Sequence, residues 1–82
     1  MIDIRNAKHD LINFIADKSF TNISKIKEDS MIFREGIFDS MGLMSLITYL
    51  EENYDIKIED SDLIEENFES INAIYKFLEK KL

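Results

Sequence analysis

The sequence predicts an all-α protein, a small bundle of three main helices and one short helix, with a long loop between the first two main helices. Apolar residues recur at helical spacing in three separate segments, and no pair of strand-like segments accompanies them. A chain of 82 residues supplies one modest core, because a polypeptide this small buries only about 60% of its unfolded surface. We therefore expect a single domain over residues 1–82.

The first helix is expected near the N-terminus. Asp3 is the candidate for its N-cap, since a side-chain oxygen there accepts a hydrogen bond from a free amide of the first turn. The residues that share its apolar face are Ile4, Ala7, Leu11, Phe14 and Ile15.

Residues 18–38 lose this periodicity but remain rich in apolar side chains. A free linker would not carry so many, so we expect a long loop that these side chains fix to the core, with room for one short helical turn. The side chains are Phe20, Ile23, Ile26, Met31, Ile32, Ile37 and Phe38.

The second helix is predicted from about Ser40 to Asn53 and has the most regular pattern in the chain. Asp39 is its predicted N-cap, with the carboxylate accepting a hydrogen bond from the amide near Gly42. The apolar positions fall at i, i+3, i+4, i+7 and i+11, and they are Leu43, Leu46, Ile47, Leu50 and Tyr54.

An extended segment, a short helix and a last helix are predicted after residue 54. Ile56 and Ile58 alternate with charged residues, and we expect this segment to place both isoleucines in the core. The stretch "DLIEENF" can hold the short helix, and Ser70 is the predicted cap of the last one. That helix has Ile71, Ile74 and Leu78 on one face and Lys80 and Lys81 at its C-terminal end, where the dipole favours cations.

Composition argues against several classes of protein. The chain has no cysteine, so neither disulfides nor thiolate metal sites hold it together. Its net charge of -7 opposes nucleic-acid binding, and all of the excess lies in residues 39–82, with four Lys and Arg against eleven Asp and Glu. No apolar run reaches a membrane span, and the N-terminus lacks the pattern of a signal peptide. We expect a cytoplasmic monomer whose acidic surface is either a solvated face or a docking face for basic partners.

Ser40 is expected to be the first residue of the second helix, where free amides and the helix dipole favour negative charge. A phosphodiester on its hydroxyl would be well placed there. At about 100° per residue, Met41, Met44 and Thr48 point away from the apolar stripe, so at least one methionine should be exposed beside Ser40, as on adaptable partner surfaces. An Asp-Ser pair alone is also simply a common way to start a helix.

The stretch "GIFDSMGLMSLITYLEENYDIKIEDSDL" resembles the carrier-protein family, the acyl and aminoacyl carriers of fatty-acid, polyketide and nonribosomal-peptide pathways. The similarity includes the Asp-Ser-Met motif, the helix after it, the acidic pair "EE" and the segment "YDIKI". Downstream, "LIEENFESINAIYKFL" resembles the closing helices of stand-alone members. The resemblance covers about residues 4–80 and implies an acyl-carrier-protein-like bundle.

The resemblance implies that Ser40 is esterified by 4'-phosphopantetheine, which a separate magnesium-dependent phosphopantetheinyl transferase takes from coenzyme A. The arm's thiol would then hold an acyl or aminoacyl group as a thioester, and the carrier itself would not be an enzyme. Asp39 would help to position the transferase and its metal. Further partners implied are a loading ligase and downstream acyl-transfer or condensing enzymes. The residues that match partner-binding positions are Met41, Met44 and Thr48, with Glu51 and Glu52 as acidic docking residues.

Two departures favour a specialised pathway over core fatty-acid synthesis. Gly42 and Ser45 stand where carriers of fatty-acid synthesis usually have acidic residues. We therefore expect a polyketide, nonribosomal-peptide or aminoacyl (D-alanyl-type) carrier. Bulky core residues, Tyr54, Phe68 and Phe77, favour a cargo that stays outside the bundle.

Three other interpretations of the sequence compete with the carrier. A hydrolase would need a base near Ser40, but His9 is the only histidine, and Phe38 breaks the G-x-S-x-G pattern. A calcium loop from Asp55 would have Lys57 at its third position and Asp60 at its sixth, where the loop needs an oxygen ligand and a glycine. An acidic helical protein-protein interaction domain without a cofactor, with Ser40 as a cap or phosphorylation site, remains the alternative.

Overall fold

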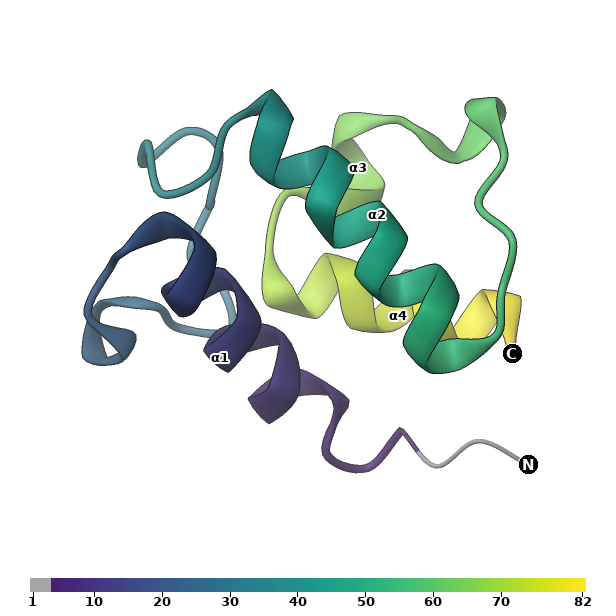
Figure 1. Cartoon of the computed structure of the whole chain (residues 1–82), viewed down its shortest axis with the longest axis horizontal. Helices are drawn as coiled ribbons and strands as arrows, with labels where there is room; N and C mark the ends of the chain where they lie inside the picture. Colours follow the sequence, from purple (N-terminus) through teal and green to yellow (C-terminus); the bar gives the residue numbers. More distant parts are fainter. Residues whose placement is uncertain (1–3) are drawn as a thin grey trace.

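The computed structural model describes residues 4–82, and these residues form helices and turns but no strand. The helices are α1 (Ala7–Ser19), α2 (Ser40–Tyr54), α3 (Glu65–Phe68) and α4 (Ile71–Lys81), with short 3-10 turns η1 (Ile23–Lys25) and η2 (Asp60–Asp62). In Figure 1, α1 and α2 run in opposite directions, and the long loop between them connects the upper end of α1 to the start of α2. The predicted all-α bundle of three main helices and one short helix is confirmed. No helix in this part of the chain is long and apolar enough to cross a membrane.

Helix α1 begins one turn later than its apolar stripe. Asn6 occupies the N-cap position without a side-chain hydrogen bond to the helix, and the predicted cap, Asp3, lies outside the described residues. Ile4 precedes the helix, where its carbonyl accepts a hydrogen bond of 3.0 Å from the Ala7 amide while its side chain packs against the core. The spacing of the apolar residues therefore predicted which face of α1 is buried, but not at which residue the helix begins.

The core lies where α1, α2 and α4 meet. From α2 it receives Leu46, Leu50 and Tyr54. The other two residues of the predicted stripe, Leu43 and Ile47, are half-buried. The buried apolar side chains among the described residues are Ala7, Leu11, Ile15, Ile26, Ile32, Phe38, Leu46, Leu50, Tyr54, Phe68, Ile71, Ile74, Phe77 and Leu78.

Backbone hydrogen bonds tie the long loop to the junction between α3 and α4. The Ile32 amide donates to the Glu69 carbonyl, and the Asn72 amide donates to the Glu28 carbonyl, both at 3.0 Å. Ile26, Ile32 and Phe38 are buried, as expected of a loop fixed to the core.

Phe20 and Ile23 were predicted to help fix this loop, and for them the prediction is wrong. Both are exposed. Helix α1 ends at Ser19, its C-cap residue Phe20 has a left-handed backbone (φ 56°), and the chain then turns into η1. This turn carries both side chains away from the core.

The segment between α2 and α4 is secured by polar contacts. The Glu51 carboxylate accepts a hydrogen bond of 3.0 Å from the Ile58 amide, and both Ile56 and Ile58 pack half-buried against the core, as predicted. The Ser70 hydroxyl accepts a hydrogen bond of 3.1 Å from the Ala73 amide, which confirms it as the cap of α4.

Candidate cofactor-attachment site

Asp39 and Ser40 are placed by a turn in the loop that precedes α2. The Ile32 carbonyl accepts hydrogen bonds of 2.9 Å from the amides of both Ile37 and Phe38, so the loop returns to the core just before the helix. Asp39 follows with an extended backbone, and its carboxylate accepts a 2.9 Å hydrogen bond from the Gly42 amide. The predicted N-cap is therefore formed, and it fixes Ser40 as the first residue of α2.

Ser40 presents a free hydroxyl at this helix terminus. The residue is exposed, and no group within residues 4–82 makes a hydrogen bond to its hydroxyl. The unsatisfied amides of the first turn give this end of α2 a partial positive charge, which favours an attached anion. The hydroxyl can therefore react with an external group, and a negatively charged product is stabilised where it forms.

An apolar hollow of about 250 Å³ adjoins Ser40 on the side of α3. Leu43 lies one turn further along α2 on the same side, and Phe68 forms the opposite wall. The hollow is open to solvent beside an exposed serine, so it can shelter an apolar part of a group attached there. Its other lining residues are Phe33, Leu63, Ile64 and Glu65.

Residues 10–78 match the family model described as a phosphopantetheine attachment site. The chain belongs to this family of phosphopantetheine-binding carrier proteins. Among similar proteins are D-alanyl carrier proteins from Bacillus cereus (strain B4264) and Bacillus anthracis (strain CDC 684 / NRRL 3495). Each is 29% identical to this carrier over 73 residues, which are 89% of this chain and 92% of the relative.

Members of the family carry covalently attached 4'-phosphopantetheine, and the residues of this carrier fit that group. A phosphodiester needs a free hydroxyl and a site that tolerates negative charge, and Ser40 at the start of α2 provides both. The hollow lined by Leu43, Leu63 and Phe68 can pack against the methyl and methylene groups of the pantetheine part. When bound, the group supplies a thiol that holds cargo as a thioester.

The carrier's two methionines on α2 are both exposed. Met41 is 80% exposed and Met44 62%, so they flank Ser40 without contributing to the core. The Thr48 hydroxyl donates a hydrogen bond of 3.2 Å to the Met44 carbonyl. Thr48 and Glu52 both lie on the exposed side of the helix. Glu51 differs from these residues because it is half-buried and bound to the Ile58 amide.

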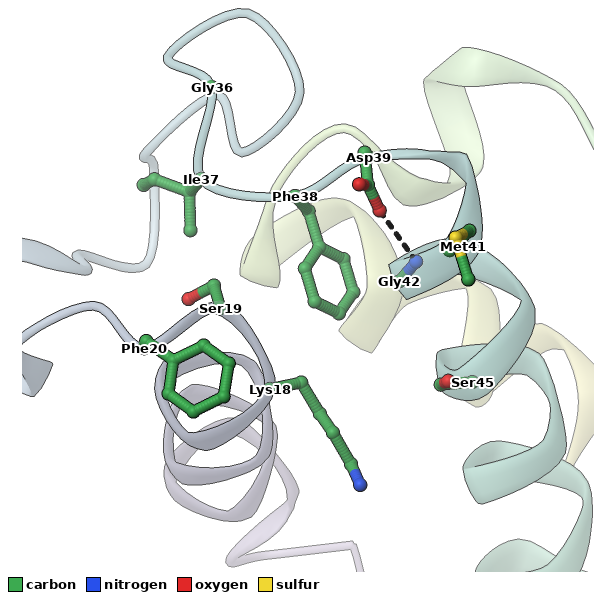
Figure 2. A pocket seen from close by; sticks show the side chains of 10 residues that line it. All are labelled: Lys18, Ser19, Phe20, Gly36, Ile37, Phe38, Asp39, Met41, Gly42 and Ser45. Atoms are coloured by element: carbon green, nitrogen blue, oxygen red, sulfur yellow. Dashed lines mark hydrogen bonds between the residues drawn. The ribbon is translucent and has the colours of Figure 1, made fainter.

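A larger hollow on the other side of α2 was not foreseen from the sequence. It has a volume of about 500 Å³, and Figure 2 shows Phe20 and Lys18 on the α1 side with Met41 and Ser45 facing them from α2. Sequence reasoning missed it because Phe20 was assigned to the core. One signal was present: Phe20 does not continue the apolar stripe of the first helix, whose next position after Phe14 and Ile15 is Lys18.

Proposed function

We propose that this chain carries 4'-phosphopantetheine on Ser40 and presents an aminoacyl group, held as a thioester, to the enzymes of a specialised pathway. The observation that supports it most is the free, exposed hydroxyl of Ser40 at the capped start of α2, inside the region that matches the family. In this role, residues 1–82 act as one carrier domain, as a monomer in the cytoplasm.

The attachment reaction is a phosphoryl-type transfer to Ser40. The hydroxyl oxygen forms a bond to the phosphorus that bears pantetheine in coenzyme A, and the bond from this phosphorus to the nucleotide phosphate breaks. Adenosine 3',5'-bisphosphate leaves, and the hydroxyl proton passes to a base of the transferase. On this chain, the amides at the start of α2 stabilise the new phosphodiester, and Asp39 helps to position the transferase and its magnesium ion.

A small cargo held outside the bundle agrees with how the interior is filled. Phe68 and Phe77 are buried with ring centroids 5.1 Å apart, and Leu46 lies fully buried in the same core. A long acyl chain would have to displace these side chains, whereas the hollow of about 250 Å³ beside Ser40 remains at the surface. Relatives named D-alanyl carrier proteins support an amino acid as the cargo, and a D-alanyl group is our first choice.

Partner enzymes are expected to bind around Ser40. We assign this role to the exposed side chains of Met41, Met44, Thr48 and Glu52, with Glu51 contributing through its partly exposed carboxylate. The partners are the transferase, a ligase that activates and loads the amino acid, and an enzyme that takes the cargo from the thioester. Methionine suits this role because its flexible side chain adapts to different surfaces.

Loading of the modified carrier tests the cargo assignment. The holo chain is incubated with ATP and an amino-acid-activating ligase, offered D-alanine, L-alanine or glycine in turn, and its intact mass is measured. A parallel reaction offers octanoate and a fatty-acyl ligase. We expect the reaction with D-alanine to add the mass of one alanyl group, which base or hydroxylamine then removes. An octanoyl thioester on this chain should hydrolyse faster than one on a carrier that buries its cargo. Efficient, hydrolysis-protected loading of octanoate alone would contradict the proposal.

A further inference from the structure

A furrow runs between α1 and α2, on the side of α2 opposite the α3 hollow. It consists of two adjoining hollows of about 500 and 350 Å³ that share Lys18 and Ser45. The rings of Phe14 and Tyr49, stacked with centroids 4.3 Å apart, join the two helices along it. Along α2 the furrow extends from Asp39 to Asn53, which is about 21 Å at 1.5 Å per residue, the length of a four-turn helix.

Phe20, at the mouth of this furrow, is not explained by the stability of the fold. Its backbone is left-handed at the position that ends α1, where glycine is strongly favoured because other residues are strained there. Its side chain is 96% exposed, so burial does not compensate for that strain. A strained residue that exposes a large apolar ring points to contact with another molecule.

The furrow changes chemically along its length. At the end next to the first turn of α2, the apolar side chains of Phe20 and Met41 face each other across the hollow (Figure 2), and the polar residues Ser19, Asp39 and Ser45 also line it. Lys18 lies where the two hollows meet, and within residues 4–82 its ammonium lies over the Phe14 ring and forms no ion pair. Glu52 lies in the far hollow. An occupant that matches this order has an apolar side chain, then a carboxylate, then a basic group.

We infer that the furrow is a docking groove for an amphipathic helix of the phosphopantetheinyl transferase, with an apolar side chain between Phe20 and Met41, a carboxylate at Lys18 and a basic residue at Glu52. A helix in a groove is a common mode of recognition, and opposite charges at two separate points fix the orientation of the helix. The transferase has to reach the Ser40 hydroxyl itself, and the residues on either side of Ser40, Asp39 and Met41, line the near end of the furrow, so this enzyme is the partner placed to contact it. Later enzymes meet the thiol at the end of a long arm. This inference rests on the proposed role of Ser40.

Transferase kinetics test the inference. The initial rate of loading is measured against the concentration of the unmodified chain, with a broad-specificity phosphopantetheinyl transferase, coenzyme A and magnesium. Phe20→Gly and Lys18→Glu should each raise KM about five-fold while kcat stays within about two-fold, because docking weakens and the reaction does not. The thermal midpoint of Phe20→Gly should equal or exceed that of the wild type, because glycine adopts the left-handed backbone without strain. If the ring only stabilised the fold, the midpoint would fall.

Matched controls carry the same chemical changes outside the furrow. Lys76→Glu reverses an exposed charge on α4, and Ile23→Ser removes an exposed apolar side chain from η1, and both should leave KM within about two-fold of wild type. Equal KM values for all four variants would overturn the docking groove while leaving the carrier function intact. A folded wild-type chain that the transferase does not modify would overturn both.

A map of the contact surface gives an independent readout. Labelled Ser40→Ala chain, which lacks the reactive hydroxyl, is titrated with unlabelled transferase, and amide chemical shifts are followed. Shifts should concentrate at residues 18–20 and 41–52. Shifts confined to α3 and α4 would overturn the assignment of the furrow.

Discussion

The ring of Phe38 lies directly against the α carbon of Gly42. A β carbon added at Gly42 would lie 2.7 Å from both Cδ1 and Cε1 of that ring, closer than such atoms approach in proteins. Phe38 is buried and held by the hydrogen bond of its amide to Ile32, so the ring has little freedom to move away. Gly42 therefore allows the loop before Ser40 to pack onto the first turn of α2.

Gly42→Ala is expected to destabilise the carrier even though alanine favours a helix. The gain in helix propensity is about 1 kcal/mol, whereas overpacking a fixed ring costs about 1 to 3 kcal/mol. In a Phe38→Ala background the clash is absent, and the same substitution should become stabilising. A double-mutant cycle of urea denaturation measures both effects, and the same sign in the two backgrounds would contradict the packing explanation.

Leu46→Ala should lower the free energy of unfolding by about 2 to 5 kcal/mol, because the side chain is fully buried among α1, α2 and α4. Met44→Ala, two residues earlier on the same helix and 62% exposed, is the control and should change stability by less than about 0.5 kcal/mol. Thermal or urea melts distinguish the two. An unchanged midpoint for Leu46→Ala would mean that the faces of α2 are assigned incorrectly.

Asp39→Ala removes the side-chain cap of α2 and should cost about 1 kcal/mol of stability. Asp39→Asn keeps an oxygen that accepts the hydrogen bond from the Gly42 amide and should cost much less. Chemical denaturation of the two variants checks the order. Equal losses would show that the charge of Asp39, not its cap, stabilises the helix.

Local patterns predicted the caps and the buried faces of this fold. Asp39 and Ser70 were identified because a cap depends on residues only three positions apart. The exposure of Phe20 was not predicted, because it depends on the direction in which the chain leaves α1. Neither the spacing of apolar residues nor the composition determines that direction. The turn η2 was missed for a related reason: it is three residues long and is held by reciprocal hydrogen bonds between Glu59 and Asp62, too short to produce a pattern.

The site was only partly predictable. The sequence placed Ser40 at the start of a helix with exposed methionines beside it, and the structure has this arrangement. The roles of Ser40, Asp39 and the partner-binding residues stay predictions. The furrow could not be foreseen, because it forms between two helices whose relative placement depends on the packing of α4 and the long loop.

Alkaline pH should destabilise the carrier partly through Tyr54. Burial raises the pKa of this phenol to about 12, and Tyr49 and the negative charge of Asp10 add to the effect. An unfolded tyrosine ionises near its ordinary pKa of about 10. The folded state therefore holds the proton more tightly, so this contribution to stability is complete below about pH 10 and is lost as the pH rises towards about 12.

Tyr54→Phe should reduce this loss, because phenylalanine does not titrate. Urea midpoints of the wild type and the variant, measured at intervals between about pH 9 and about pH 11.5, test the prediction. A wild-type midpoint that falls no faster than that of Tyr54→Phe would contradict it.

Attachment of the cofactor to Ser40 is tested by the intact mass of the purified chain. Wild type, Ser40→Ala and Ser45→Ala are each incubated to completion with a phosphopantetheinyl transferase, coenzyme A and magnesium. Ser45 is an exposed serine in the next turn of α2 and serves as the control. We predict a gain of one phosphopantetheinyl group on wild type and Ser45→Ala and none on a folded Ser40→Ala. Loading of Ser40→Ala would contradict attachment at Ser40, and no loading of any folded chain would contradict the carrier function.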